Sequence, residues 1–467
     1  MRNKNLKWKK RKVFFYPCLQ INFSVGGNRV SENKGLQSFL FIWGGQLGSL
    51  LGSSLTSFAL GVYILQQTGS VSNFAITLLC MSIPGLIISP FAGALVDKWN
   101  RKGMMLASDI LSGFATLGVF AIVFFSQLQL WHIYTAVIMW SVAGSMQFPA
   151  YQSIVAQIVE RKHLGRANGL IQMSDAASSI VAPPIAGILL PFIHIQGILI
   201  IDFFSFFLAI FSLLIVKIPP IQFSESFRKK QSILLDIKDG IQYLRINKAL
   251  LWFLTYFSLA NFILGFENVL LQPLILSMSD AKNLGFVMSC IGLSMVLGGL
   301  VISAWGGPKR KTRGVFGFGL ISSLFFTFVW GCHSIPVMCV FLFVTFFFLP
   351  FGNTCSQVIW QSKVEPSIQG RVFALRRMIA MSLMPISYML SAPLLDHVFA
   401  PLMSSHAIGG KLLGGWLGVG ENSGIRLFLM LLGIIWLLTT ILLSFHKEIK
   451  LLDKDEGSKE SMVPAST

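Results

Sequence analysis

Long apolar segments alternate with shorter polar ones along most of the chain. A helix needs roughly 20 predominantly apolar residues to cross the hydrocarbon core of a bilayer. The first six segments of that kind are Phe39–Gln66, Phe74–Val96, Met104–Gln127, His132–Val159, Gly169–Ile193 and Gly197–Val216. The second six are Leu251–Leu276, Leu284–Trp305, Val315–Cys332, Pro336–Trp360, Val372–Phe399 and Ile425–Phe445. The pattern predicts an all-α membrane protein with twelve transmembrane helices.

Polar stretches divide the chain into five parts. We predict a basic cytoplasmic tail at 1–37, a first six-helix half at 38–216, a cytoplasmic linker at 217–248, a second six-helix half at 249–446 and a cytoplasmic tail at 447–467. A weak repeat supports the two halves. The motif Val-Glu-x4-Gly-Arg begins at Val159 and again at Val364, 205 residues later, each time before an odd-numbered segment.

The basic residues predict which side of the membrane each loop occupies. The formal net charge is +18, and 34 of the 37 Lys and Arg lie in the two tails and in alternate loops. The other loops carry only Lys282, Lys411 and Arg426. Cytoplasmic loops of membrane proteins are enriched in Lys and Arg, so both termini are expected in the cytoplasm. Basic residues dispersed over seven segments also argue against nucleic acid as a partner.

Composition agrees with a membrane protein and offers no catalytic chemistry. Hydrophobic residues make up 54% of the chain and charged residues only 12%, whereas soluble domains carry about 25% charged residues. The six cysteines form no Cys-x-x-Cys pair, which argues against a metal site or a disulfide framework. The sequence contains no phosphate-binding loop and no nucleophile motif. We therefore expect no enzyme activity, no catalytic residues, no metal and no cofactor.

The strongest motif lies between the second and third segments, at residues 93–102, and reads Gly-Ala-Leu-Val-Asp-Lys-Trp-Asn-Arg-Lys. It resembles the signature G-x-L-x-D-[RK]-x-G-[RK]-[RK] of the major facilitator superfamily. Asn100 replaces the glycine of the signature, and both residues tolerate a left-handed turn. The resemblance implies a gating motif that braces the two halves, with Asp97 facing the start of the eleventh segment. Its residues are Gly93, Asp97, Arg101 and Lys102.

Other segments are similar to bacterial macrolide-efflux-type permeases of that superfamily: Ile-Trp-Gly-Gly-Gln at 42–46, Trp-His-Ile-Tyr at 131–134 and Gln-Gly-Arg-Val-Phe at 369–373. The resemblance implies the major facilitator fold and a monomer in the bacterial plasma (inner) membrane. It also implies proton-coupled export of amphiphilic small molecules, such as macrolide-like drugs, peptides or secondary metabolites, by rocking of two halves about a central site. Two positions depart from the family. Trp140 stands where an Arg often linked to proton coupling is expected, and the span-5 antiporter motif survives only as Ala-Pro-Pro-Ile-Ala-Gly at 182–187.

Five acidic residues lie inside the segments or at their edges: Asp109, Asp175, Asp202, Glu267 and Asp396. A charge at the bilayer centre costs roughly 2.5–3.5 kcal/mol or more, so each needs a partner or a polar cavity. Glu267 lies deepest, in a segment that usually lines the central cavity of the superfamily, and we predict that it takes part in proton coupling. Asp109 is the next candidate, although a structural hydrogen-bonding role is equally open. Asp202 is expected to be structural.

Polar residues form a stripe on each of two predicted helices. On the first segment they fall within roughly 80° of arc and on the seventh within roughly 60°. The residues are Gln46, Ser49, Ser53 and Thr56 on the first, and Asn261, Asn268 and Gln272 on the seventh. These stripes predict walls of the substrate path. The alternative is that they form interhelical hydrogen bonds, as small polar residues in membranes often do.

Two other functions remain open at this stage. The first is an importer or facilitator on the same fold, because the sequence hardly separates the directions of transport. The second is a receptor or scaffold that transports nothing. Glu267 and the two polar stripes argue against the second, since such a protein needs neither a buried acid nor a polar cavity.

The predicted topology is testable with reporter fusions. Fusions in the tail after Phe445 and in the loop around Lys411 should give opposite signals, because 34 of 37 basic residues lie on one predicted side. Matching signals would rule out the twelve-span arrangement.

Asp97→Asn should impair transport while the protein still inserts into the membrane. The expectation follows from the place of the motif between the halves and from the basic residues beside Asp97. Membrane yield and transport rate are measured side by side, and a parental transport rate would contradict the gating role.

Overall fold

The protein is a bundle of long helices. The structure, a computed structural model, describes residues 32–96, 100–160, 163–218, 242–364 and 369–449. All regular elements in these ranges are helical. The first group comprises α1 (Glu32–Thr68), α2 (Val71–Val96), α3 (Arg101–Phe125), α4 (Leu130–Ile158) and α5 (Leu164–Ile215). The second comprises α7 (Lys248–Met278), α8 (Ala281–Trp305), α9 (Lys311–Phe328), η3 (Val329–Gly331), α10 (Ile335–Lys363), α11 (Gln369–Leu394), η4 (Leu395–Phe399), α12 (Ala400–Leu402), α13 (Ile408–Leu417) and α14 (Glu421–Ser444).

Ten helices in the described ranges are long and apolar enough to cross a membrane. The 29-residue helix α4 is not among the ten, although the sequence predicts a span there. Helix α5 runs for 52 residues, but His194 inside it has φ 53° and ψ −173°, which is not helical. That residue falls between the predicted fifth and sixth segments, so the chain changes direction where the sequence pattern placed a boundary.

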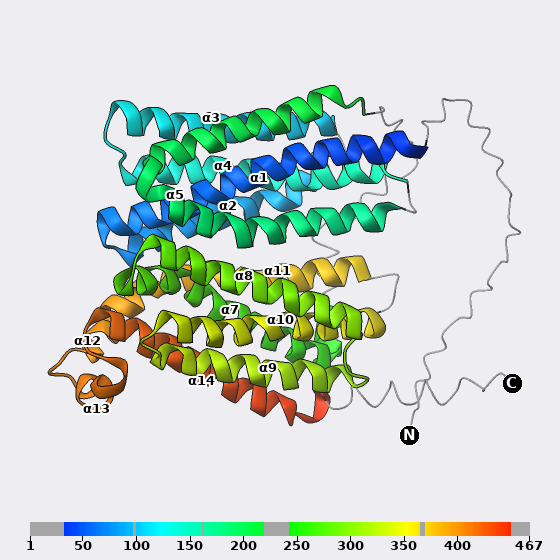
Figure 1. Cartoon of the computed structure of the whole chain (residues 1–467). Coiled ribbons are helices and arrows are strands. Elements are labelled where there is room, and N and C mark those ends of the chain that lie inside the picture. The colour runs from blue at the N-terminus through cyan, green and yellow to red at the C-terminus, as the bar shows by residue number, and fades with distance from the viewer. Residues whose placement is uncertain (1–31, 97–99, 161–162, 219–241, 365–368, 450–467) are drawn as a thin grey trace, which may run out of the picture.

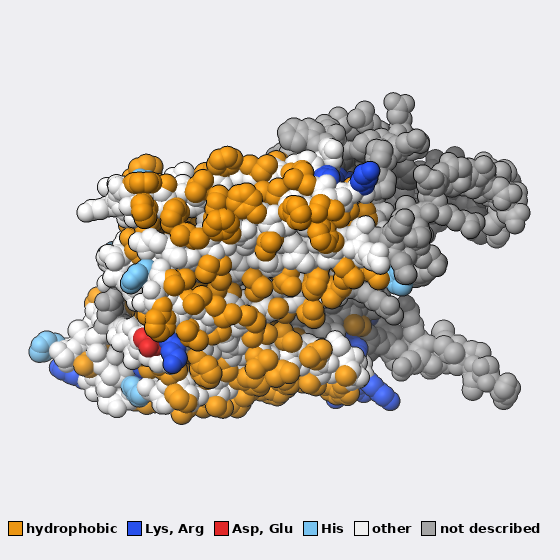
Figure 2. Space-filling model, turned by 45° about the horizontal axis from the view of Figure 1, so that its top comes forward, with side chains coloured by type: hydrophobic (Ala, Val, Ile, Leu, Met, Phe, Trp, Pro, Cys, Tyr) orange, Lys and Arg blue, Asp and Glu red, His pale blue; other side chains and the backbone are white. Residues whose placement is uncertain are grey.

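The two ends of the bundle carry more charged side chains than its flank. In Figure 1, α1–α5 lie together above α7–α14 with their axes roughly aligned. We call the end at which α1 begins and α14 ends the basic end, because Arg101, Lys102, Lys311 and Lys363 lie there. The short helices α12 and α13 lie at the opposite end (Figure 1). Hydrophobic side chains cover the flank in Figure 2, while charged ones gather towards the ends, as expected of a surface that contacts lipid.

The two groups pack internally in matching ways. In the first group α1 packs against α5, α2 against α4, and α3 against both α4 and α5. In the second group α7 packs against α11 and α14, α8 against α10, and α9 against α10 and α14. The main contacts between the groups are α5 with α8 and α2 with α11. Helix α2, which takes part in one of these contacts, ends at Val96 within the 93–102 motif.

The contact between α5 and α8 depends on a missing side chain. A Cβ atom at Gly285 of α8 would lie 2.5 Å from the carbonyl oxygen of Pro183 and 2.9 Å from the Cα atom of Pro184. Ser289, one turn along α8, donates a hydrogen bond to the carbonyl oxygen of Ile180 at 2.6 Å. Because the nearest atoms at Gly285 are backbone, a larger residue there must separate the helices.

Gly285→Ala should therefore destabilise the protein, by about 1–3 kcal/mol as for other overpacked sites. Gly299→Ala is the matched control on the same helix, because a Cβ atom there meets nothing within 4 Å. Thermal unfolding in detergent measures both variants. Equal melting temperatures would show that α5 and α8 do not approach each other this closely.

Candidate functional site

A hydrogen-bonded triangle of two amides and one carboxyl joins three helices of the first group. Gln46 of α1 donates from Nε2 to Oδ2 of Asp109 at 3.1 Å. Gln147 of α4 donates from Nε2 to Oδ1 of Asp109 at 2.6 Å and to Oε1 of Gln46 at 2.9 Å. Asp109, on α3, is 1% exposed. The structure thus brings together two residues that the sequence singled out and adds Gln147, which it did not.

A second buried carboxyl, Asp202 of α5, lies farther along α1 and is held by hydroxyl groups. Ser53 of α1 donates to Oδ1 of Asp202 at 3.1 Å, and Thr116 of α3 donates to Oδ2 at 3.2 Å. Ser49 and Thr56 of the same α1 stripe are also buried. Gln46 and Ser53 therefore make interhelical hydrogen bonds, which was the alternative explanation of the stripe. The role of these four residues in the substrate path stays a prediction.

Glu267 lies in the middle of α7 and is 4% exposed. Its carboxyl group makes no hydrogen bond to another side chain of the part of the chain that the structure describes. Helix α11 passes close by: Tyr388 lies within electrostatic reach of the carboxyl, and a Cβ atom at Gly265 would collide with the hydroxyl of Ser387. Glu267 therefore points into the packed interior of the second group, near α11.

The three amides predicted as a stripe on α7 have different surroundings. Asn268 is exposed, and its Nδ2 donates to the carbonyl oxygen of Leu264 on its own helix at 2.8 Å. Gln272 lies against Gly61 of α1, and its buried Oε1 accepts no hydrogen bond among the described residues. Asn261 lines a cavity of about 90 Å³ enclosed by α7, α9, α10 and α14.

The 93–102 motif is described only in part. Asp97 lies outside the described residues, and Gly93 belongs to the last turns of α2. Arg101 donates from Nη1 to the carbonyl oxygen of Ser153 in α4 at 3.3 Å. Lys102 donates from Nζ to the carbonyl oxygens of Leu214 and Val216 at 3.2 and 2.9 Å. Both basic residues therefore tie the start of α3 to the ends of neighbouring helices.

Asn100 does not use the left-handed conformation that both Asn and Gly tolerate. Asn100 has φ −67° and ψ 113°, which is extended backbone, and its side-chain oxygen accepts from the backbone N–H groups of Lys102 and Gly103. Asn caps helix N-termini in this manner because its side chain satisfies otherwise unpaired N–H groups. The residue begins α3 instead of turning the loop.

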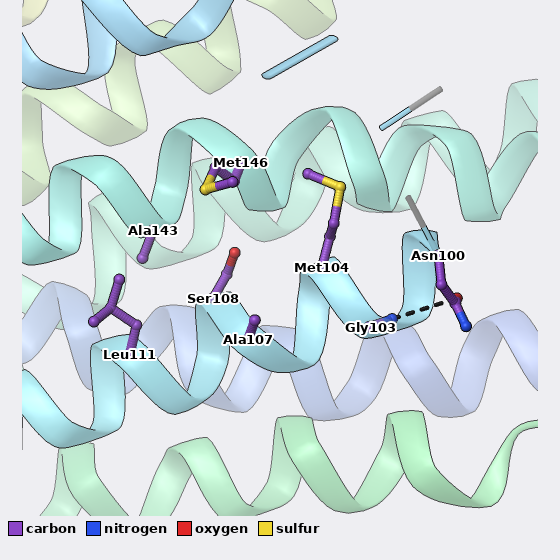
Figure 3. Close-up of a pocket in the computed structure, with 8 residues that line it drawn as sticks. All are labelled: Asn100, Gly103, Met104, Ala107, Ser108, Leu111, Ala143 and Met146. Carbon is purple, nitrogen blue, oxygen red and sulfur yellow. Dashed lines mark hydrogen bonds between the residues drawn. The ribbon is translucent and has the colours of Figure 1, made fainter. Parts of the chain in front are cut away.

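An apolar hollow of about 400 Å³ lies between α3 and α4 next to the triangle. Figure 3 shows its lining residues: Asn100, Gly103, Met104, Ala107, Ser108 and Leu111 from the α3 side, and Ala143 and Met146 from α4. Ser108 and Met146 are the sequence neighbours of Asp109 and Gln147. At this level part of the surface between α3 and α4 is not filled by side chains of the described residues.

Sequence reasoning missed Gln147 of the triangle, and it did not predict the partners of Arg376 in the second group of helices. Gln147 is an uncharged amide inside an apolar segment, and that signal alone could have marked it. Arg376 of α11 donates to Oε1 of Gln357 at 2.9 Å and to Oγ of Ser356 at 3.1 Å, and lies 5.0 Å from the ring centre of Trp360. Its partners among the described residues of α10 are neutral, and these contacts fix α11 to α10.

The described residues contain no group of three His, Cys, Asp or Glu side chains that could hold a metal ion. The buried acids Asp109 and Asp202 have amides and hydroxyls as partners, and none of these partners is a cation. This arrangement suits groups that bind and release protons within a membrane helix bundle, where ionisable residues often mark proton relays.

Comparison with known proteins gives a consistent result. The sequence profile of the Major Facilitator Superfamily matches residues 42–388. Macrolide efflux protein A of Streptococcus pyogenes is 26% identical over 374 residues, which cover 77% of this chain and 90% of that protein. Macrolide efflux protein A of Enterococcus faecalis is 25% identical over 318 residues, covering 65% and 95%. The crystal structure of a point mutant of the nucleoside transporter NupG is similar in fold, with a TM-score of 0.68 at 14% identity, covering 88% of this chain and 100% of that one.

Proposed function

The chain belongs to the Major Facilitator Superfamily, and we propose that it is a secondary active transporter that exports amphiphilic small molecules in exchange for protons. Membership of this superfamily makes it a multi-pass membrane transporter of small molecules and not an enzyme. The finer claims, export and proton coupling, are part of the proposal. Two halves would rock about a central site, so that the site opens to one side of the membrane at a time.

The observation that carries the proposal is the set of buried carboxyls inside helices long and apolar enough to span a membrane. Asp109, Asp202 and Glu267 are each at most 4% exposed. A charged acid in such a position is costly, and acids persist there mainly where they serve transport or proton movement. Three of them in one bundle support a proton-linked cycle over a receptor or scaffold, which requires none.

The proposed architecture has twelve spans in two halves, at residues 38–216 and 249–446, joined by a cytoplasmic linker at 217–248. Ten helices meet the length and hydropathy criteria. Counting α4 as a span, and α5 as two spans that meet at His194, gives twelve. The matching contacts within α1–α5 and within α7–α14 support the division. Both termini would lie in the cytoplasm, and the protein would be a monomer in the plasma membrane.

The substrate class rests on the relatives. Two of them are named macrolide efflux proteins, and both are matched over 90% or more of their own length. Macrolides are bulky and amphiphilic, so we propose a substrate of this kind. At 25–26% identity the side chains that select a substrate can differ, and a macrolide is therefore the first probe to use.

Among the predicted site residues, we propose Glu267 as the proton-coupling acid of the second half. It lies next to α11, whose contact with α2 joins the two groups of helices. A carboxyl in an apolar setting without a counter-charge favours its neutral form. Water or a cationic substrate that reaches the group would favour release of the proton. Asn261, Asn268 and Gln272 on the same helix remain proposed contacts of the substrate path, and Asp97 with its basic neighbours the proposed gate.

Glu267→Gln tests this role because the amide keeps the shape of the side chain but cannot ionise. We expect the variant to bind a macrolide and to lose accumulation against a gradient, since each cycle could no longer carry a proton. Uptake of radiolabelled macrolide into everted vesicles, with and without an imposed proton gradient, measures the effect. Asp396→Asn is the matched control, because Asp396 is an exposed acid in η4 and its removal should change little.

The outcomes separate the alternatives. Uphill uptake by Glu267→Gln with unchanged pH dependence would move the coupling role to another acid. Uptake by the parental protein that equilibrates but never concentrates macrolide would indicate a facilitator. No flux of any probe in reconstituted liposomes would contradict transport of this substrate class.

A further inference from the structure

We infer that Gln147 is a positioning residue that links protonation of Asp109 to the packing of α4 against α1 and α3. The inference deepens the proposed function and rests on it for its role in transport, but not for the link itself. Its basis is the triangle of three contacts: Gln46 with Asp109, Gln147 with Asp109, and Gln147 with Gln46. Each residue contacts the other two, so the donor or acceptor choice at one contact restricts the others.

The ionised carboxylate satisfies all three contacts. Each carboxylate oxygen accepts one amide N–H, from Gln46 at Oδ2 and from Gln147 at Oδ1. The second N–H of the Gln147 amide group is then free to donate to Oε1 of Gln46. A primary amide has two N–H donors and one carbonyl acceptor, and this arrangement uses them without conflict.

The neutral acid leaves one polar group of this cluster unpaired, whichever way the amides are turned. In the observed orientation both carboxyl oxygens face amide N–H donors, so the added O–H finds no acceptor among these contacts. Turning the amides to accept that O–H creates a conflict instead. With a proton on Oδ2, Gln46 must turn its carbonyl to Asp109 and its N–H to Gln147. Gln147 must then present an oxygen to Gln46, and that oxygen also faces the unprotonated Oδ1. With a proton on Oδ1, the same conflict moves to Oδ2. One pair of like groups always remains, and a buried pair of that kind is costly. Protonation of Asp109 therefore either leaves its O–H unpaired or breaks one side of the triangle, and both outcomes weaken the contacts of α4.

Asp202 shows by contrast why amides matter. Its partners are the hydroxyls of Ser53 and Thr116, and a hydroxyl can rotate from donor to acceptor. If Asp202 takes up a proton, one hydroxyl can accept from it without disturbing the other contact. Both acids are buried and both connect to α1, yet at Asp109 the amide partners cannot take up a proton without leaving a polar group unpaired.

Two features of α4 should allow this helix to move near Gln147 when a hydrogen bond is lost. Pro149 follows Gln147 by two residues within the helix, and a proline removes one backbone hydrogen bond and favours a bend. The hollow of about 400 Å³ leaves part of the α3–α4 surface unfilled, and its lining includes Ser108 and Met146, the sequence neighbours of Asp109 and Gln147 (Figure 3). Apolar packing of α4 is therefore incomplete near the polar contacts that hold it. Loss of these hydrogen bonds should increase the mobility of α4 before that of the other helices.

Among the described residues, no neighbouring charged or titratable side chain contacts the carboxyl of Asp109. Arg101 and Lys102 on α3 donate to backbone carbonyls near the basic end. On α5, which packs against α3, Asp202 is held by its hydroxyl partners. Tyr151 lies one turn from Gln147 on α4, and its buried hydroxyl has no hydrogen-bond partner in the described part of the chain. None of the described contacts of Asp109 supplies a cation that would hold it ionised.

Hydrogen exchange of the full-length protein in lipid nanodiscs tests the inference without any substrate. Peptides that cover residues 140–158 are followed by mass spectrometry at mildly acidic and mildly alkaline pH, after correction for the intrinsic pH dependence of amide exchange. We expect α4 to exchange about two- to tenfold faster at acidic pH, the effect of losing one hydrogen bond. Peptides of α9, which packs against other helices, should show no such change.

Three variants make the result specific. Asp109→Asn carries a neutral group at both pH values and should exchange in α4 at the fast rate throughout. Gln147→Met keeps the size of the side chain, removes two of the three contacts and should abolish the pH dependence. Asp202→Asn is the matched control and should retain the parental pH dependence. Thermal unfolding verifies that each variant is folded, and if Asp109→Asn is not, Gln147→Met still decides.

Parental exchange in α4 that is independent of pH would overturn the inference, and so would a pH dependence that survives in Gln147→Met. Failure of the proposed function is a separate outcome. If α4 responds to pH as expected but vesicles never concentrate macrolide in response to a proton gradient, the link between Asp109 and α4 stands and proton-coupled export of macrolides does not.

Discussion

The hydrocarbon core of a bilayer contains no water, so a polar side chain within a membrane helix is costly unless it finds a partner inside the protein. Helix α1 meets this requirement for the first group of helices. Its Gln46 contacts Asp109 of α3, and its Ser53 contacts Asp202 of α5. The same helix lies close enough to α5 that a Cβ atom at Gly45 would collide with Ser212. The positions of α3, α4 and α5 therefore depend on polar contacts that converge on α1.

Sequence reasoning predicted the helices well because the requirement behind them is local: about 20 apolar residues in a row are sufficient. It also placed a boundary between the fifth and sixth segments, where His194 leaves the helical region. It missed α13, a short helix at the opposite end, because ten residues between two spans carry no length signal. It did not foresee that Asn100 caps α3, because the glycine of the family signature has no side chain that could play this role.

The polar stripes show the limit of periodicity. Helical spacing predicts that Gln46 and Ser53 lie on one face of α1, and the structure agrees. Periodicity says nothing about what that face contacts, which depends on how other helices pack. A second signal was present: Gly45 and Gly52 repeat with the same seven-residue spacing, one position earlier, and small residues allow close helix approach in membranes. Ser205 and Ser212 of α5 lie against these glycines. Reading polar and small residues together would have favoured an interhelical contact.

The kind of partner, and not only its presence, decides how a buried acid responds to a proton. Glu267 has no hydrogen-bond partner among the described side chains, so protonation there breaks no contact and removes an unpartnered charge. At Asp109 protonation leaves a polar group of the interhelical triangle unpaired or breaks one of its contacts. Under the proposed function the two acids, one in each half, would thus respond to protonation in opposite ways. Protonation of Glu267 removes an unfavourable charge from the second half, whereas protonation of Asp109 weakens helix contacts in the first half. Trp140 occupies the position where the family often carries an Arg, and a fixed cation near Asp109 would have opposed that response by favouring the ionised acid at all times.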